Sequence, residues 1–236
     1  MFQDNVFRLI IDPPRSAALN MAIDEFLMNE ASKPRRIPVL RIYSWEAPSY
    51  SVGYFQKIDE VVGKIKASQE DIAVVRRLTG GGWVFHGEDL TFSLVIRYPN
   101  PFFSNDTKSS YLKINEALMM GFRELHPKLD FADCKTLPSG RARNGRICFE
   151  LPACYDLLLR GKKVVGASQR RSAGVVLHQS AVFLGDDKKV LTGKILEGFR
   201  EKWKIDFEEL PLSNDELEKA REIEKGRYSS PEWAIS

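Results

Sequence analysis

The sequence predicts an α+β fold, in which helices pack against mixed, largely antiparallel sheets. Segments with the alternation of strands and segments with helical spacing follow one another without a regular β-α-β repeat. Several predicted strands are joined by short turns, as in hairpins. The 236 residues are 43% hydrophobic and 28% charged, which is the balance of a globular chain with a sizeable core.

The first half of the chain combines strands with one capped helix. A strand over 7–11 ends at a run with two prolines, and Ser16 can cap the helix that follows. Asn20 and Asp24 lie four residues apart in this helix, so we expect them to share one of its faces. Further strands are predicted over 39–45, 49–54, 72–75 and 90–96, and an amphipathic helix over 58–69.

The second half begins with a predicted helix over 111–125, and a loop rich in glycine and arginine follows over 135–146. A turn at Gly161 joins two strands, and a third strand covers 174–184. The chain then becomes charged and helical, over 189–199 and 214–226, with Ser213 or Asn214 as a cap. We therefore expect a catalytic domain over residues 1–185 and, over 186–236, a short charged helical extension of the same domain.

Composition excludes several classes of function. A net charge of +3 does not indicate a nucleic-acid-binding protein. No apolar window is long enough for a membrane span, and the first residues lack the pattern of a secretion signal. The three cysteines, Cys134, Cys148 and Cys154, are odd in number and match no zinc spacing, so neither a disulfide nor a structural metal site is predicted. We expect a reducing, cytoplasmic compartment.

The most informative run contains three consecutive glycines between two predicted strands, and we interpret it as a glycine hairpin. Glycine lets a ligand lie directly on the backbone, and turned N–H groups can bind an anion. Basic side chains flank the turn and favour a carboxylate or phosphate guest. The residues in question are Arg76, Arg77, Gly80, Gly81, Gly82 and His86, the last followed by Asp89 in a His-x-x-Asp pattern.

Two further patches can carry chemistry. Cys148 lies at the edge of a loop with three arginines, and nearby positive charge favours the reactive thiolate. Lys162 and Lys163 are adjacent in a predicted strand, so their side chains must point to opposite faces of the sheet. One of them can therefore face solvent while the other faces a pocket.

Four short patterns follow one another along the chain: LNMAIDE at 19–25, WEAPSYSVGYFQ at 45–56, RRLTGGGWVFH at 76–86 and GKKVVGASQ at 161–169. In this order, and over most of the chain, they resemble one family. It comprises the lipoate–protein ligases and octanoyl-transferring enzymes, which are related in fold to biotin–protein ligases. The resemblance implies a biotin/lipoate protein ligase-like catalytic domain of the α+β class.

The resemblance also implies roles for single residues. Lys163 is expected to contact the activated acyl carbonyl, where a fixed cation stabilises the charge that develops on oxygen. Asp156 matches an acidic position near the adenylate and magnesium of the ligases. Cys148 matches the spacing of the nucleophile in the cysteine-dependent transferases. The remaining residues are expected to bind the acyl substrate: Arg76, Thr79, Gly80, Gly81, Gly82, His86, Gly166, Ala167 and Ser168.

Two reactions fit this family. A ligase activates lipoate with ATP and Mg²⁺ to lipoyl-AMP, and Gly82 favours this reaction because cysteine-type transferases tend to carry arginine there. A transferase moves octanoyl from acyl-carrier protein through a thiol and needs no cofactor. Cys148 and the absence of the ligases' Gly-Arg-Asn-Asp element favour it, since this chain keeps only Asp156. On balance the sequence predicts the ligase.

The expected partners are the same for both reactions. They are lipoyl domains that present one lysine, as in the E2 subunits of 2-oxoacid dehydrogenases and the H protein of glycine cleavage. Acyl-carrier protein is a further partner in the transferase reaction. Two other functions stay open: a non-catalytic module that binds lipoate or lipoyl domains, and a biotin–protein ligase.

Overall fold

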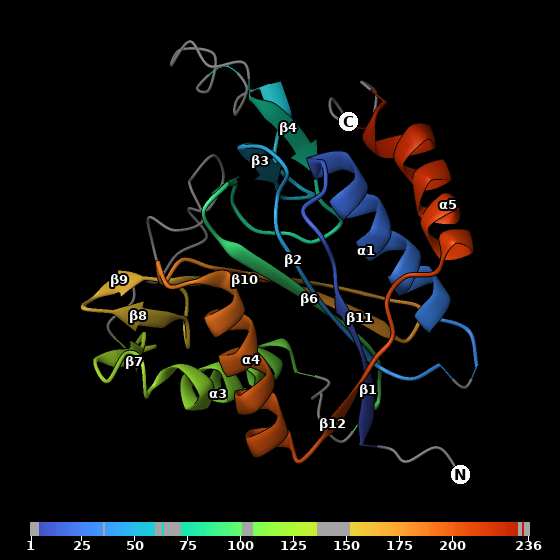
Figure 1. The fold of residues 1–236 in the computed structure, drawn as a ribbon. Coiled ribbons are helices and arrows are strands. Elements are labelled where there is room, and N and C mark those ends of the chain that lie inside the picture. Colours follow the sequence, from blue (N-terminus) through green and yellow to red (C-terminus); the bar gives the residue numbers. More distant parts are fainter. Residues whose placement is uncertain are drawn as a thin grey trace.

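The protein is described here from a computed structural model, which describes residues 5–34, 36–59, 63, 72–100, 106–135, 152–230 and 233. The predicted helix over 58–69 and the predicted loop over 135–146 lie largely outside these residues, and Cys148 lies wholly outside them. A six-stranded sheet forms the centre, and two three-stranded sheets flank it (Figure 1). None of the helices in these ranges combines the length and apolar character that crossing a membrane requires.

The central sheet is mixed, as predicted. Its strands lie in the order β10-β11-β6-β2-β1-β12. β1 pairs in parallel with both β2 and β12, whereas the pairs β2–β6, β6–β11 and β10–β11 are antiparallel. The strands are β1 (Val6–Ile11), β2 (Val39–Tyr43), β6 (Leu90–Arg97), β10 (Val165–Ser172), β11 (Val175–Val182) and β12 (Asp206–Glu209).

Helices cover both faces of this sheet, because its central strands are buried on both sides. Along β6, Leu94 belongs to the core under α3 and α4, and its neighbour Val95 to the core under α1. Figure 1 shows α4 crossing α3 and α5 lying beside α1. The helices are α1 (Ala17–Ala31), α3 (Thr107–Phe122), α4 (Lys188–Trp203) and α5 (Asn214–Ile223), which a π-helical turn (Glu224–Tyr228) extends.

Two predicted helix caps are confirmed. The side chain of Ser16 accepts a hydrogen bond from the N–H of Leu19, and α1 starts at the next residue. Ser213 forms a capping box with Glu216 at the start of α5. Local sequence signals therefore place the beginnings of both helices.

The glycine hairpin is a wrong prediction. The strand before the glycines, β4 (Ala73–Arg76), pairs in parallel with β3 (Ser49–Val52), and β5 (Val84–His86) pairs with the other edge of β3. The next strand, β6, belongs to the central sheet. The glycine run packs against Gly53, where a Cβ atom would overlap the Gly81 carbonyl. Glycine is required at position 53 for this close backbone approach.

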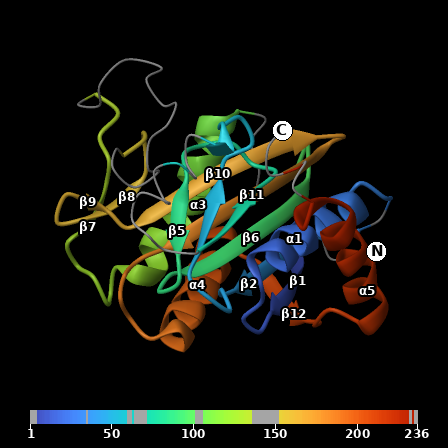
Figure 2. The same ribbon diagram turned by 90° about the horizontal axis from the view of Figure 1, so that it is seen from above.

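The third sheet contains β7 (Leu129–Phe131), β8 (Leu157–Leu159) and β9 (Lys162–Lys163). Figure 2 shows it on the side of the molecule opposite α5. The predicted turn at Gly161 joins β8 to β9 and is confirmed.

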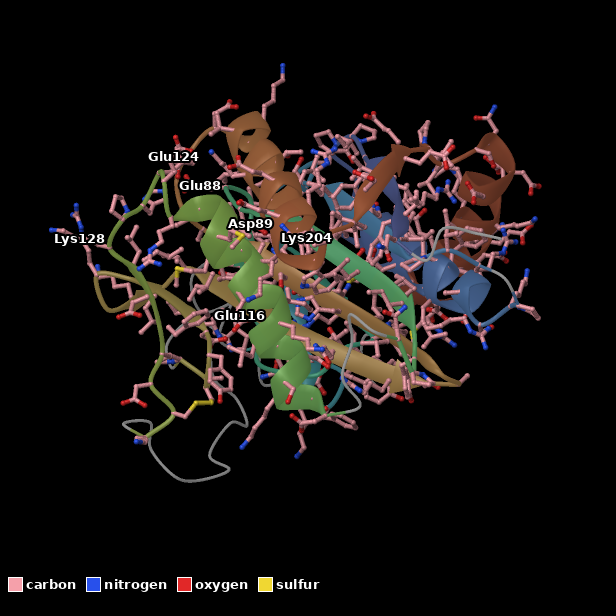
Figure 3. The ribbon with its side chains drawn as sticks, turned by 90° about the horizontal axis from the view of Figure 1, so that it is seen from below. Glu88, Asp89, Glu116, Glu124, Lys128 and Lys204 are labelled. Atoms are coloured by element: carbon pink, nitrogen blue, oxygen red, sulfur yellow. A yellow bond between two sulfur atoms is a disulfide. The ribbon has the colours of Figure 1, made fainter. Side chains whose placement is uncertain are left out.

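Contrary to the prediction from cysteine count, Cys134 and Cys154 form a disulfide, drawn as a yellow bond in Figure 3. The pairing of β7 with β8 brings together the two ends of the segment that connects these strands. The Cα atoms of the two cysteines lie 4.6 Å apart. This separation is typical of disulfides. The spacing of the cysteines along the chain contains no information about this pairing.

A pair of glycines lets α3 and α4 cross closely. A Cβ atom on Gly198 of α4 would overlap the backbone of Ala117 in α3, and one on Gly121 would overlap the backbone of Lys194. We expect Gly198→Ala to destabilise the protein by about 2–3 kcal/mol, because backbone cannot yield as a side chain can. Urea unfolding measures this. Gly193→Ala in the same helix, where a Cβ atom has open space, should not destabilise it.

Candidate active site

A pocket opens between the central sheet and the β4–β3–β5 sheet. It encloses about 340 Å³ between atoms, part of it open to solvent. Strands β2, β10 and β11 supply one wall, and β3, β5 and the segment after β4 supply the other. The lining residues are Met21, Tyr43, Trp45, Ser51, Arg77, Val84, His86, Thr91, Gly166, Ala167, Ser168, Gln179, Ser180 and Ala181.

Arg77 lines this pocket, whereas Arg76 had been expected there. Arg77 donates to the carbonyl oxygens of Gly80 and Gly82, both at 2.7 Å, and to Ser51 Oγ at 3.1 Å. The guanidinium of Arg76 donates instead to the carbonyls of Tyr54 and Gln56. Adjacent side chains leave an extended backbone on opposite sides, and Arg76 is the one that turns away. The position next to the pocket thus belongs to Arg77, which holds the glycine turn in place.

His86 is buried at the base of the pocket. Its Nδ1 lies 2.9 Å from Asp89 Oδ2 and its Nε2 lies 2.8 Å from Ser51 Oγ, while its ring stacks on Trp45 at 3.9 Å between centroids. Burial lowers the pKa of His86 and outweighs the opposite effect of Asp89. The imidazole is therefore neutral at neutral pH, with Nδ1–H donating to Asp89 and Nε2 accepting from Ser51.

Asp89 (labelled in Figure 3) is fully buried. Burial alone would raise its pKa, but the electrostatic interaction with His86 and hydrogen bonds from His86, Thr91 and the Gly87 N–H together lower the pKa below its usual value. Asp89 is thus a carboxylate at neutral pH and fixes the tautomer of His86.

A second hydrogen-bond chain connects the two walls of the pocket. Ser168 Oγ donates to Thr79 Oγ1 at 2.7 Å, and Thr79 donates to Gln179 Oε1 at 2.6 Å. Gln179 Nε2 then donates to Asp24 Oδ2 at 2.7 Å. The chain joins β10, the glycine turn, β11 and α1 by four side chains that are all buried.

Behind the pocket, Arg41 is fully buried among oxygen atoms. It donates to Asp24 at 2.8 Å, to Asp12 at 2.7 Å and to the side chain of Asn20 at 2.7 Å. The predicted common face of Asn20 and Asp24 is confirmed by this shared partner. Burial would lower the pKa of Arg41, but Asp24 and Asp12 raise it overall, so the guanidinium is charged.

Lys163 and Asp156 form a buried ion pair beside the start of β10. Their charged atoms lie 2.7 Å apart, and the side chains are only 4% and 7% exposed. Asp156 Oδ2 also accepts from the N–H of Ala153, which fixes the carboxylate. The neighbouring Lys162 is exposed, as expected for one of two adjacent strand lysines. Gly166, three residues after Lys163, lines the pocket.

The structure brings together some of the predicted site residues, while Lys163 and Asp156 pair with each other outside the pocket lining. His86, Gly166, Ala167 and Ser168 line the pocket, and Thr79 is bonded to Ser168. Arg77 was recognised beside the glycines, but Arg76 was taken as the site residue, and the roles of Ser51, Gln179 and the buried carboxylates Asp24 and Asp89 were not predicted. The His86-x-x-Asp89 pattern was the one sequence signal for a carboxylate partner of His86. Gln179 comes near Asp24 only through the pairing of β11 in the sheet.

Asp156 was expected near magnesium. Within the described ranges, no group of three His, Cys, Asp or Glu side chains is placed to hold a metal ion. Asp156 Oδ2 is already engaged by Lys163 and Ala153. Mg²⁺ that is bound together with substrate phosphates needs only one or two protein carboxylates, so the position of Asp156 near magnesium stays a prediction.

Comparison with known proteins gives one family. Residues 16–209 match the family described as the lipoyl protein ligase A/B catalytic domain. Among curated proteins, the octanoyltransferase LipM of Carboxydothermus hydrogenoformans is 33% identical, over 92% of this chain and 94% of that protein. LipM of Bacillus subtilis is 32% identical, over 98% of both chains.

Two solved structures have a fold similar to that of this chain. A Thermoplasma acidophilum protein described as a lipoate protein ligase, with bound lipoic acid, has a TM-score of 0.77 and 25% identity, over 97% of this chain and 99% of that one. A lipoate-protein ligase A bound with ATP has a TM-score of 0.78 and 24% identity, over 98% of both chains. The predicted α+β catalytic domain is thereby confirmed.

Proposed function

Because the chain belongs to the family of lipoyl protein ligase A/B catalytic domains, we propose that it is a cysteine-dependent octanoyltransferase acting on lipoyl-domain lysines. The observation that carries this proposal is similarity to octanoyltransferases over nearly the whole length of both chains. Cys148 supports it, because the transferase reaction needs a thiol. The order of preference from sequence alone, which put the ligase first, is therefore reversed.

The proposed reaction has two steps. The Cys148 thiolate attacks the carbonyl of an octanoyl thioester, and the donor thiolate leaves with the bonding electrons and takes up a proton. The amine of the target lysine then attacks the new thioester, loses a proton and releases Cys148 as the amide bond forms. In both steps negative charge develops on the carbonyl oxygen. The ammonium group of Lys163 is proposed to stabilise that charge, and Asp156 to hold the ammonium in place.

The acyl chain is proposed to occupy the pocket next to His86. Its lining combines apolar groups such as Met21, Val84 and Ala181 with side chains whose polar atoms bond to the protein. Thr79, Gly80, Gly81 and Gly82 are proposed to form the wall that Arg77 supports. The proposed partners are lipoyl domains and acyl-carrier protein, in the cytoplasm.

A lipoate–protein ligase is the second candidate. Gly82 favours it, as does the 25% identity to the T. acidophilum protein with bound lipoic acid. This reaction would require ATP and Mg²⁺, which the transferase does not.

Two assays on the purified protein separate these candidates. Octanoyl-loaded acyl-carrier protein and an apo lipoyl domain are mixed with the enzyme without ATP, and the domain is weighed by mass spectrometry. We expect an octanoyl adduct, and its loss in Cys148→Ser. Lipoate with ATP should release no pyrophosphate. Pyrophosphate release that survives Cys148→Ser would instead establish the ligase, and lipoate binding without any transfer would indicate a non-catalytic module.

A further inference from the structure

We propose that Asp24 and Asp89, two buried carboxylates outside the lining of the pocket, are positioning residues that turn its polar hydrogens away from the acyl chain. Each lies at the end of a hydrogen-bond chain that begins at the pocket wall. This inference rests on the proposed function, because it takes the pocket as the site of an apolar chain.

A polar lining poses a physical problem for such a ligand. Hydroxyl, amide and indole groups line the pocket, and an acyl chain offers them no acceptor. A buried donor that loses its partner costs about 1–3 kcal/mol. The pocket can therefore bind an apolar chain tightly only if its donors are satisfied within the protein.

The chain that ends at Asp24 has a fixed direction. Asp24 accepts four hydrogen bonds, two at each oxygen: from Arg41 and Ser93 at Oδ1, and from Tyr43 and Gln179 at Oδ2. A carboxylate can only accept, so the amide nitrogen of Gln179 must face it. The amide oxygen then faces Thr79 and takes its hydrogen.

The hydrogen bonds between Gln179 and the pocket surface all point in the same direction. Since the hydrogen of Thr79 is directed to Gln179, the oxygen of Thr79 accepts from Ser168. The hydroxyl hydrogen of Ser168 thus points into the wall, and its β-carbon faces the glycine turn at Gly81. Asp24 sets this orientation from three side chains away, without contact with the ligand.

Asp89 acts in the same way on the residues around His86. Thr91 donates to it at 2.6 Å and in turn accepts from the indole N–H of Trp45 at 2.9 Å. His86 donates through Nδ1, which leaves Nε2 to accept the hydrogen of Ser51. The hydrogens of Ser51, Thr91 and Trp45 are therefore all directed to protein atoms.

The first test removes the link to Asp24. Gln179→Met keeps the length of the side chain but takes away the acceptor of Thr79. We expect kcat/KM for octanoyl transfer to fall roughly tenfold to a hundredfold, the equivalent of one buried donor left without a partner. Unchanged kcat/KM would overturn the proposal.

A matched pair of variants separates donor orientation from direct contact with substrate. Thr79→Val leaves the Ser168 hydroxyl without its acceptor, whereas Thr79→Val combined with Ser168→Ala removes that hydroxyl as well. Every other hydrogen bond that Thr79→Val removes is absent from both variants. We expect the double variant to transfer octanoyl several-fold faster than Thr79→Val alone. If Ser168 were instead a substrate contact, the double variant would be slower, and that result would overturn the proposal.

Thermal unfolding of each variant shows whether the fold is kept. If Gln179→Met does not fold, the Thr79 pair decides the question. If the proposed function is wrong, the wild-type protein will ligate lipoate and will not transfer octanoyl. This outcome is distinct from a failure of the positioning proposal, which would appear only in the variants. The same variants are then compared in the ligation assay, since lipoate also brings an apolar chain of similar length into the pocket.

Discussion

Lys163→Ala is expected to lower the rate of acyl transfer roughly 100- to 1,000-fold while the protein stays folded. This is the range measured when one group that stabilises a developing oxyanion is removed. The ammonium is buried and held by Asp156 at 2.7 Å, so it is fixed before substrate arrives. Single-turnover transfer of octanoyl to a lipoyl domain measures the effect, with circular dichroism to monitor the fold.

The chain supplies a matched control one residue away. Lys162 is exposed at the same β8–β9 turn, so Lys162→Ala removes an equal charge from the surface and should reduce transfer less than twofold. Lys163→Ala also leaves Asp156 without its ammonium partner, and Lys163→Ala combined with Asp156→Ala removes that unpaired charge. The double variant should regain stability but not activity. Recovery of transfer in it would show that Lys163 only neutralises Asp156.

Arg41→Met is expected to destabilise the protein by about 3–5 kcal/mol, the usual cost of breaking a buried ion pair on one side. The substitution leaves Asp24 and Asp12 facing a sulfur atom that cannot donate to them. For a chain of this size the melting temperature should fall by about 10 °C. Differential scanning calorimetry at neutral pH provides the measurement.

Arg36→Met is the control for Arg41→Met. Its side chain is 53% exposed and pairs with Glu30 at the surface, so its loss should change stability by less than about 1 kcal/mol. Equal effects of the two substitutions would mean that the buried network around Arg41 contributes nothing beyond a surface ion pair.

Local patterns were sufficient for much of the fold. The apolar runs of β1 and β6 and the cap at Ser16 could be recognised, because each depends on a few neighbouring residues. The order of motifs along the chain also identified the family, and with it the fold class. Adjacent strand residues face opposite ways, which indicated that one of Lys162 and Lys163 could face a pocket, and the resemblance to the family indicated Lys163.

Other features depend on contacts distant in sequence. Arg76 and Arg77 are adjacent in the sequence, but the position of β3 decides which one reaches the pocket. The glycine run looked like a hairpin because its close packing on Gly53 leaves no local signal. The role of Gln179 requires the register of β11 against β6, which places its side chain toward α1.

The pairing of β1 with β12 has a consequence for synthesis. β1 is synthesised before β12, and residues 12–205 lie between the two strands. Until β12 is synthesised, the N–H and C=O groups on one side of β1 have no strand beside them, and such an edge can pair with another chain. The nascent protein therefore exposes an unpaired strand edge while the residues between β1 and β12 are synthesised, which is a specific reason to expect chaperone binding at β1.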